Sequence, residues 1–272
     1  MPLRTDPCQF LDAVVDLARE AGRRIMAIYA SDFRVGEKDD RSPLTAADLA
    51  AHDCLVAGLH RLRPGYPLLS EESVAIPYAE RAEWQTYWLI DPLDGTKEFI
   101  KRNGEFTVNI ALIHQGQAVL GVVDAPALGV TYFAAEGSGA FRRQGDAEPV
   151  AIKVRDQAAR PLRVVGSRSH GSPEMEIYLG RLGEQERLPV GSSLKFCLVA
   201  EGKADIYPRI GLTSEWDTAA AQCVVEQAGG AVVDLDGHPL RYNAKESILN
   251  PYFLVYGDKS QDWTQYAAGI PG

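Results

Sequence analysis

The spacing of apolar residues in the first quarter of the chain predicts two helices. Between Phe10 and Tyr29, apolar residues recur at every third or fourth position, which is the period of one buried face of an amphipathic helix. A charged loop, residues 36–42, comes next, and Thr45 then offers the hydroxyl typical of a helix N-cap. We expect the second helix to run from Thr45 to Leu62.

From residue 67 onward the period drops to two, which indicates strands joined by short turns. The expected strands are residues 67–70, 87–90, 106–113, 118–123, 131–134 and 140–143. Beyond residues 155–161, strands alternate with helices. The strands expected there are 162–165, 204–207, 231–233 and 253–256, and the helices are 173–182, 194–201 and 218–228. The prediction is one compact unit with an N-terminal α+β lobe, residues 1–157, and a C-terminal α/β lobe, residues 158–272.

Composition narrows the class of ligand. A chain of 272 residues with 46% hydrophobic content can bury a large core. Its formal net charge of −9 argues against a nucleic-acid polymer as partner, because binding to a phosphate backbone relies on a basic surface. A small phosphorylated ligand is still compatible with this charge, since bound cations would reverse its sign locally.

Cysteine usage and the lack of long apolar runs indicate a soluble protein that is not exported. The cysteines lie far apart and form no Cys-x-x-Cys pair, so we expect buried free thiols in a reducing cytosol. They are Cys8, Cys54, Cys197 and Cys223. No run of 18 apolar residues occurs, and the N-terminus has no signal-peptide core. The expected location is cytoplasmic, without an integral membrane segment.

The most informative segment is residues 88–96, where an apolar strand leads into two carboxylates, a glycine and a hydroxyl. Asp91 and Asp94 can face one cluster of hard cations, because Pro92 fixes φ and bends the chain between them. Gly95 lets the backbone approach an anion, and the amides of Gly95 and Thr96 can point at phosphate oxygens. The alternative is an ordinary turn, which Asp-Pro and Asp-Gly dipeptides mark in any protein.

The run Asp-Pro-Leu-Asp-Gly-Thr at residues 91–96 resembles the signature of the lithium-sensitive, magnesium-dependent phosphatases of the inositol monophosphatase superfamily. Further segments match in the expected order at residues 42–48, 70–72 and 216–220. Lys-Glu-Phe at 97–99 and the runs 191–196 and 207–209 are most similar to the bacterial CysQ type of 3′(2′),5′-bisphosphate nucleotidase. The resemblance implies a layered α-β-α-β-α sandwich, with peripheral association with the inner membrane as a further possibility.

The resemblance also implies a magnesium site of two or three ions, which suits oxygen ligands. Asp91 would bridge two ions, Glu71 and the Leu93 carbonyl would complete one shell, and Asp94 with Asp217 would complete the other. Taken alone, Glu71 could belong to a solvated acidic loop. Asp217 could equally be the N-cap of the helix that follows it.

The proton acceptor is assigned by resemblance as well. No Ser-His-Asp pattern or reactive cysteine suggests a covalent intermediate. In the family, the residue matching Thr96 passes a proton from a metal-bound water to the residue matching Asp48. Spacing alone favours another interpretation of Asp48, because Thr45-x-x-Asp48 is typical of a capping box at a helix start.

Substrate specificity is expected to come from the C-terminal lobe. By resemblance, His170, Ser192, Lys195 and Arg209 hold the second phosphate of an adenosine bisphosphate, and lysine and arginine supply the charge such a phosphate needs. Taken alone, His170 could be a turn residue, Lys195 an exposed helix residue and Arg209 the end of a surface strand. Residues of the metal segment are expected to contact the substrate too, namely Glu71, Leu93, Asp94, Gly95, Thr96 and Asp217.

The predicted function is magnesium-dependent hydrolysis of adenosine 3′,5′-bisphosphate to AMP and phosphate, which removes a by-product of sulfate activation. One alternative is an inositol or sugar phosphate monoesterase of the same superfamily. Another is a noncatalytic sensor of phosphorylated ligands, whose mark would be a lost Asp48, Thr96 or metal carboxylate, and none is missing. Walker and Gly-x-Gly-x-x-Gly motifs are absent, which disfavours a kinase or a dehydrogenase. The sequence leaves the oligomeric state open.

One residue departs from the resemblance. Asp124 lies in Gly-Val-Val-Asp-Ala-Pro, where relatives commonly carry an aromatic or apolar residue. Asp124 does not touch the metal motif but could alter the neighbouring wall, and the sequence leaves its effect open. The histidines outside the specificity segment lack the spacing of zinc ligands and are expected in the surface or the core. These are His52, His60, His114 and His238.

Overall fold

The computed structural model describes residues 6–31, 43–63, 65–73, 76–166 and 172–271. Its first layer consists of two packed helices, α1 (Leu11–Tyr29) and α2 (Pro43–Leu62), with a short 3₁₀ turn, η1 (Pro7–Phe10), before them. Helix α2 begins at Pro43, so the prediction of an N-cap at Thr45 is wrong. Proline is favoured in a first helical turn, because its missing N–H would have no partner there.

The second layer is a seven-stranded sheet in which the strands lie in chain order. They are β1 (Leu68–Ser70), β2 (Thr86–Asp94), β3 (Thr107–His114), β4 (Gln117–Ala125), β5 (Val130–Ala135), β6 (Gly139–Gln144) and β7 (Val150–Ile152). Only the β1–β2 pair is parallel. Helices cover both faces, which is why most residues of the central strands are buried. The exposed edge strand β7 was not predicted, because three residues give no readable period.

Strand β2 continues through the predicted motif instead of ending before it. Its pairing with β3 runs from Asp91 opposite Asn109 to Asp94 opposite Thr107, so β2 carries one extra residue. Pro92 sits in this bulge, where a missing ladder donor is tolerated. The expected bend between the two aspartates is therefore a bulge inside the strand. The short helix α4 (Thr96–Ile100) follows directly.

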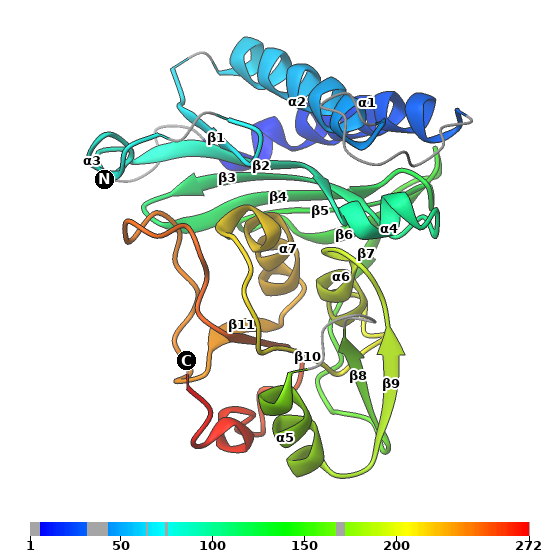
Figure 1. Cartoon of the computed structure of the whole chain (residues 1–272), viewed down its shortest axis with the longest axis vertical. Helices are drawn as coiled ribbons and strands as arrows, with labels where there is room; N and C mark the ends of the chain where they lie inside the picture. Colours follow the sequence, from blue (N-terminus) through cyan, green and yellow to red (C-terminus); the bar gives the residue numbers. More distant parts are fainter. Residues whose placement is uncertain (1–5, 32–42, 64, 74–75, 167–171, 272) are drawn as a thin grey trace.

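The second sheet has five strands in the order β11-β12-β10-β8-β9. They are β8 (Leu162–Gly166), β9 (Gln185–Pro189), β10 (Ile206–Arg209), β11 (Ala231–Asp234) and β12 (Phe253–Tyr256). Helices α6 (Leu194–Ala200) and α7 (Glu215–Gln227) lie between the sheets, and α5 (Pro173–Leu182) and η2 (Thr264–Ala267) lie outside (Figure 1). The polar strand β9 and the one-turn helix α3 (Tyr78–Arg81) were not predicted.

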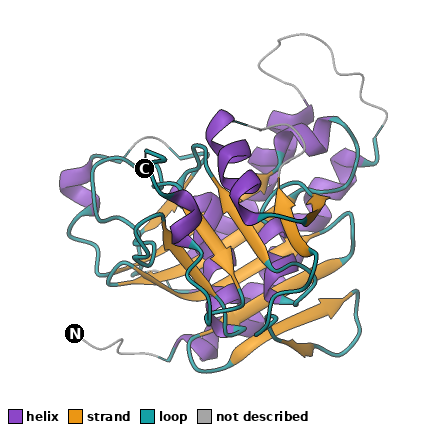
Figure 2. Ribbon diagram, turned by 90° about the horizontal axis from the view of Figure 1, so that it is seen from below, coloured by secondary structure: helices purple, strands orange, loops and turns teal. Residues whose placement is uncertain are grey.

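The layer order is thus α-β-α-β-α, as expected (Figure 1). Figure 2 views the molecule from below, so that the layers overlie one another. The chain passes from the first sheet to the second between Ile152 and Leu162. Helix α7 nevertheless packs on strands of both sheets. The division into two lobes at residue 157 stays a prediction.

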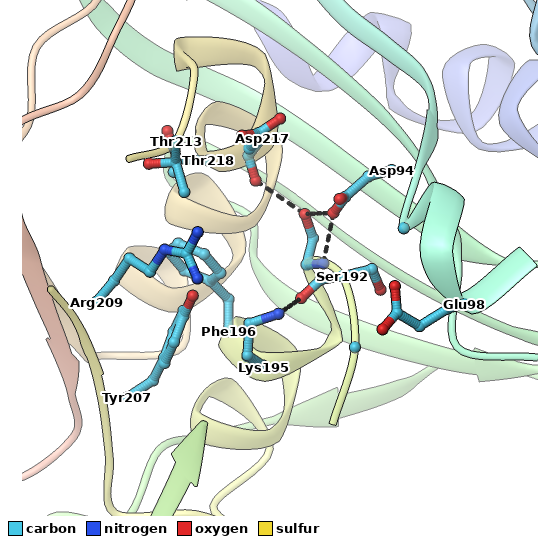
Figure 3. A pocket seen from close by; sticks show the side chains of 13 residues that line it. Asp94, Glu98, Ser192, Lys195, Phe196, Tyr207, Arg209, Thr213, Asp217 and Thr218 are labelled. Carbon is cyan, nitrogen blue, oxygen red and sulfur yellow. Dashed lines mark hydrogen bonds between the residues drawn. The ribbon is translucent and has the colours of Figure 1, made fainter. Parts of the chain in front are cut away.

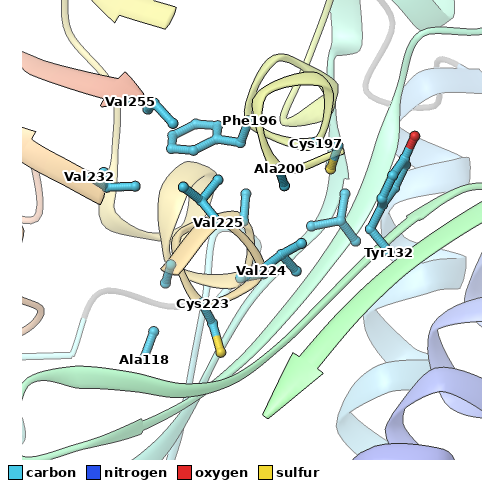
Figure 4. Packing of buried hydrophobic residues seen from close by; sticks show 14 of the residues in the cluster. Ala118, Tyr132, Phe196, Cys197, Ala200, Cys223, Val224, Val225, Val232 and Val255 are labelled. Carbon is cyan, nitrogen blue, oxygen red and sulfur yellow. The ribbon is translucent and has the colours of Figure 1, made fainter. Parts of the chain in front are cut away.

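Helix α7 joins the two sheets through a shared core (Figure 4). A Cβ on Gly121 of β4 would lie 2.1 Å from the Ala220 carbonyl oxygen, so glycine is needed for this close approach. Valines on α7 pack with Phe196 of α6 and Val255 of β12. All four cysteines are free thiols, of which three are buried and Cys8 is half-buried. The core therefore fixes the start of α7 against the end of β2.

Asp124 lies on the face of the first sheet that α1 covers. The Thr131 hydroxyl donates to its Oδ1 at 2.7 Å, and a Cβ on Gly22 would lie 2.5 Å from its Oδ2. Burial raises the pKa of this carboxyl to about 6, although the Thr131 hydrogen bond and then Arg19 and Arg23 oppose the shift. Asp124 does not line the cavity that contains Asp94, so it forms no part of the wall of that cavity.

Candidate functional site

Three of the predicted metal carboxylates meet in space. Oxygen atoms of Glu71, Asp91 and Asp217 all lie within 4.8 Å of one another. They come from the turn after β1, from β2 and from the first turn of α7. The Glu71 N–H donates to the Ile90 carbonyl at 3.3 Å, which ties the turn to β2. Glu71 is solvent-exposed, but it belongs to this cluster and not to a separate acidic loop.

Asp91 is the buried centre of the group, with 1% of its surface exposed. Its Oδ1 accepts from the Leu93 N–H at 3.0 Å, and its Oδ2 has no hydrogen-bond partner in the described part of the chain. Burial, and then the charges of Asp94, Glu71 and Asp217, raise its pKa well above the usual range. A desolvated carboxylate oxygen without a donor, among other carboxylates, is suited to a bound cation.

Asp217 has a second role at the start of α7. It is the third residue of the helix and accepts from the Ser214 N–H at 2.8 Å, so the N-cap is Ser214 and the predicted N-cap at Asp217 is wrong. Burial and then Asp94 raise the pKa of Asp217 to about 7. Although Glu71 is exposed as a whole residue, partial desolvation of its carboxylate and then the charges of Asp94 and Glu72 also raise its pKa. The cluster therefore carries mutual repulsion that a cation would relieve.

Asp94 lies outside this group of three and is held by Ser193, a residue that our sequence analysis did not select. The N–H and hydroxyl of Ser193 lie 2.6 and 2.8 Å from Asp94 Oδ2. The same hydroxyl lies 2.8 Å from the Asp217 carbonyl oxygen, and the Asn109 side-chain amide donates to it at 2.9 Å. Side-chain contacts among four separate segments leave no local pattern in a sequence.

Asp48 faces the acidic cluster from α2. It is 8% exposed, and burial followed by the charges of Glu72 and Glu71 raises its pKa to about 8. Because α2 begins at Pro43, Asp48 is the sixth helical residue, and the capping-box interpretation is wrong. Thr96 is half-buried at the start of α4, which contacts α2. The pairing of Thr96 with Asp48 stays a prediction.

His52 supports the turn that carries Glu71. It lies one helical turn after Asp48, and its Nδ1 is hydrogen bonded to Ser70 Oγ at 3.0 Å. Ser70 Oγ in turn accepts from the Glu72 N–H at 3.3 Å. The spacing of four from Asp48 was a signal that could have placed His52 beside the site.

The residues predicted to bind phosphate line one cavity with two of the carboxylates (Figure 3). Asp94 and Asp217 lie on one side and Lys195, Arg209 and Tyr207 on the other. The remaining lining residues are Gly95, Glu98, Gly191, Ser192, Ser193, Phe196, Thr213 and Thr218. His170 lies outside the described residues, and Leu93 is buried and does not line the cavity.

The two basic side chains of the cavity, Lys195 and Arg209, are held in different ways. Lys195 is 8% exposed, its Nζ donates to the Ser192 carbonyl at 2.5 Å, and it lies 5.5 Å from the centre of the Tyr207 ring. Burial lowers its pKa to about 8, while Asp94 opposes the shift. Lys195 is therefore not an exposed helix residue. Arg209 is half-buried and donates to the Leu212 carbonyl at 2.8 Å.

The turn before α6 shapes this cavity. The Gly191 N–H donates to Glu105 Oε2 at 2.8 Å, and a Cβ on Gly191 would lie 2.4 Å from Cγ of Glu98. Ser192 has a positive φ of 48°, a conformation that is uncommon for a residue with a side chain. The turn is thus fixed to the first sheet while it presents Ser192 to the cavity.

A carboxylate cluster beside a basic cavity, in an α-β-α-β-α sandwich, defines the class as a metal-dependent phosphatase. Residues 6–265 match the model of the inositol monophosphatase family, and the chain belongs to this family. The resemblance noted at residues 91–96 is confirmed. In the described part of the chain, none of the helices is both long and apolar enough to cross a membrane.

Individual relatives agree with this membership. The 3′(2′),5′-bisphosphate nucleotidases CysQ of Salmonella typhimurium and Escherichia coli K12 are each 54% identical over 247 residues, which is 90% of this chain and 98% of theirs. The crystal structure of CysQ from Bacteroides thetaiotaomicron, a bacterial member of the same family, is similar with a TM-score of 0.83 and 44% identity. The match covers 91% of the present chain and 97% of the Bacteroides thetaiotaomicron CysQ chain.

Proposed function

We propose that this chain is a magnesium-dependent 3′(2′),5′-bisphosphate nucleotidase that hydrolyses adenosine 3′,5′-bisphosphate to AMP and inorganic phosphate. The observation that carries the proposal is the single cavity with Asp94 and Asp217 on one side and Lys195 and Arg209 on the other. A substrate with two phosphates needs a site for each. The names of the relatives at 54% identity support the same substrate, and the role is removal of a by-product of sulfate activation in the cytoplasm.

The cation site is made of hard oxygen ligands, which favour magnesium over softer metals. Glu71, Asp91 and Asp217 would hold the ions, with Asp94 and the Leu93 carbonyl completing the shells of two or three of them. When bound, the ions supply a polarised water and neutralise charge on the phosphoryl group. The unpartnered Oδ2 of Asp91 is the clearest sign that these residues fit such ions.

Proton transfer is assigned to Thr96 and Asp48. Asp48 is a buried carboxylate on α2, beside Glu71 and Glu72, and desolvation makes such a carboxylate more basic than an exposed one, which suits a proton acceptor. Thr96 stands at the start of α4, after the left-handed Gly95. Its hydroxyl is assigned to pass a proton from the attacking water to Asp48.

The distal phosphate is assigned to Lys195 and Arg209, with Ser192 in the same cavity, and His170 is added by the family resemblance alone. Lys195 is buried, and its desolvation disfavours the charged ammonium, so an anionic ligand that accepts from Nζ would stabilise the charged form. Arg209 has a buried Nε without a partner among the described residues, which leaves that donor available to a ligand. A phosphate that no metal contacts needs such donors.

Two other functions remain to be separated by experiment. An inositol or sugar phosphate monoesterase would share the metal site. A substrate with one phosphate gives Lys195 and Arg209 no partner, whereas a sugar bisphosphate has a second phosphate and is therefore included in the assay. A noncatalytic sensor would have lost part of the machinery, whereas Asp48, Thr96 and all four carboxylates are present.

The test is phosphate release from adenosine 3′,5′-bisphosphate, inositol 1-phosphate and fructose 1,6-bisphosphate, with magnesium or with excess chelator. We expect the adenosine substrate to be preferred by at least about tenfold in kcat/KM, with AMP as the nucleoside product and no turnover in chelator. A preference for inositol 1-phosphate would reject the substrate. Undiminished turnover in chelator would reject the metal site.

A further inference from the structure

Ser193 and Asn109 form a buried hydrogen-bonded pair at the junction of four elements. They are 2% and 1% exposed, and the Asn109 amide donates to Ser193 Oγ at 2.9 Å. Asn109 lies on β3, and Ser193 immediately precedes α6. Through Ser193 the pair reaches Asp94 at the end of β2 and the Asp217 carbonyl in α7.

The donors and acceptors of this pair restrict how Asp94 can lie. The Ser193 N–H donates to Asp94 Oδ2 at 2.6 Å, its one partner among the described residues. The hydroxyl accepts from Asn109, so its one proton goes either to Asp94 Oδ2 or to the Asp217 carbonyl. Oδ2 of Asp94 is therefore committed to Ser193, which leaves Oδ1 as the oxygen free to face a cation.

Asn109 adds a second feature. It is paired with Asp91 across β2 and β3, which places both side chains on one face of the sheet. Asn109 Oδ1 and Asp91 Oδ2 are both buried and have no hydrogen-bond partner among the described residues. Since the Asn109 amide nitrogen is used by Ser193, its oxygen is turned away from Ser193. Two unpartnered acceptor oxygens on paired residues of neighbouring strands suit a hydrated cation.

We propose that Ser193 and Asn109 are positioning residues of the cation site. Ser193 fixes the orientation of Asp94 relative to Asp217, and Asn109 fixes Ser193 and adds a neutral oxygen next to Asp91. The inference rests on the proposed function only in its use of magnesium, because it holds for any phosphate substrate. A purely structural role for the pair would affect folding stability but not magnesium affinity.

The test is calorimetric titration of magnesium into the substrate-free protein, with Ser193→Ala, Asn109→Leu and a control, Ser138→Ala. Ser138 is also hydrogen bonded in a turn, through its hydroxyl to the Ala135 N–H and carbonyl, and is outside the proposed site. We expect Ser193→Ala to weaken magnesium binding by about tenfold, since a hydrogen bond to a charged group is lost. Asn109→Leu should weaken it to a similar degree, and the control should change it less than about twofold.

Kinetics provide the second readout. At saturating magnesium, Ser193→Ala should lower kcat and leave KM for the nucleotide within about twofold, because Lys195 and Arg209 are untouched. If Ser193→Ala does not fold, Ser193→Cys keeps the volume with a weaker donor and should show the same direction. Magnesium affinity equal to wild type in the folded variants would overturn the proposal, as would an equal loss in Ser138→Ala. Weakened magnesium binding in a protein that does not hydrolyse the bisphosphate would uphold it and reject the proposed substrate.

Discussion

Two buried aspartates on opposite faces of the first sheet show how surroundings decide what a buried charge does. Asp91 faces α6 and α7, has an oxygen without a partner, and is surrounded by other carboxylates. Asp124 faces α1, accepts a hydrogen bond from Thr131, and has Arg19 and Arg23 nearby. Burial raises the pKa of both. Of these two aspartates, only Asp91 has neighbouring charges that raise its pKa further, so only the surroundings of Asp91 favour binding of a cation.

The difference separates a functional site from a structural one. Carboxylates that repel one another lower the stability of the metal-free fold, and such an arrangement persists where ligand binding offsets the cost. Burying Asp124 lowers the stability of the fold less, because two arginines and the Thr131 hydroxyl compensate for part of the desolvation of its carboxylate. The predictions below test this contrast in order of expected effect.

The largest effect is expected for Asp91→Asn. The substitution keeps the shape of the side chain but removes the charge at the centre of the cluster, so it should lower kcat/KM by at least about a thousandfold, or several kcal/mol of transition-state stabilisation. Steady-state phosphate release measures this. Asp124→Asn is the matched control on the opposite face and should keep activity within about twofold of wild type. Activity near wild type in Asp91→Asn would contradict the site.

The next effect concerns stability and pH. The native pKa of Asp124, about 6, lies above the ordinary value of 3.8, so the native state holds this proton more tightly than the unfolded state. Its contribution is therefore fully present below pH 3.8 and is lost as pH rises toward and through 6, by about 3 kcal/mol in total. Asp124→Asn removes this loss and should be more stable than wild type at about pH 8, with little difference at about pH 4.

Urea unfolding at both pH values checks the prediction, because the midpoint shift at unchanged slope reports the change in stability. The variant Thr131→Val should act in the opposite direction at about pH 8, since it removes the donor to the ionised carboxylate. A stability difference between Asp124→Asn and wild type that does not vary with pH would show that Asp124 does not titrate in this range.

A smaller effect is expected at the basic side of the cavity. Lys195→Ala and Arg209→Ala should each raise KM for adenosine 3′,5′-bisphosphate by about 10- to 150-fold, which is roughly 1.5–3 kcal/mol for a charged contact. Adenosine 3′-phosphate lacks the distal phosphate and should lose far less. Kinetics with both substrates decide the matter. Equal losses on the two substrates would mean that these residues do not recognise the distal phosphate.

The smallest effect is inhibition by lithium, which should reduce the rate severalfold when it competes with magnesium for a site of hard oxygens. Lys195→Ala should leave the inhibition constant unchanged, because the lysine is assigned to the phosphate and not to the cations. An altered constant in this variant would show that the two ends of the cavity are not independent.

Much of the fold could be predicted from residue periodicity. The ranges 173–182 and 253–256 match α5 and β12 to the residue, since their ends carry clear signals such as Pro173. Short or polar elements, among them β7 and β9, give too few periods to be recognised. The start of α2 was misplaced because Thr45 and Pro43 offered competing signals within one turn.

Less of the site could be derived from the residues alone. Periodicity places Glu71 and Asp91 at strand ends, but their meeting with Asp217 depends on the packing of α7 between two sheets. The resemblance at residues 91–96 supplied that link. Ser193 and Asn109 were missed because their hydrogen bonds join segments up to 99 residues apart. Such contacts follow from tertiary packing and leave no spacing rule.

The most direct test of the contrast between the two aspartates is magnesium binding to the substrate-free protein, measured by calorimetry for wild type, Asp91→Asn and Asp124→Asn. If Asp91 is the centre of a cation site, Asp91→Asn should bind magnesium at least about tenfold more weakly, while Asp124→Asn should bind within about twofold of wild type. Equal binding by all three proteins, or an equal loss in both variants, would contradict the account.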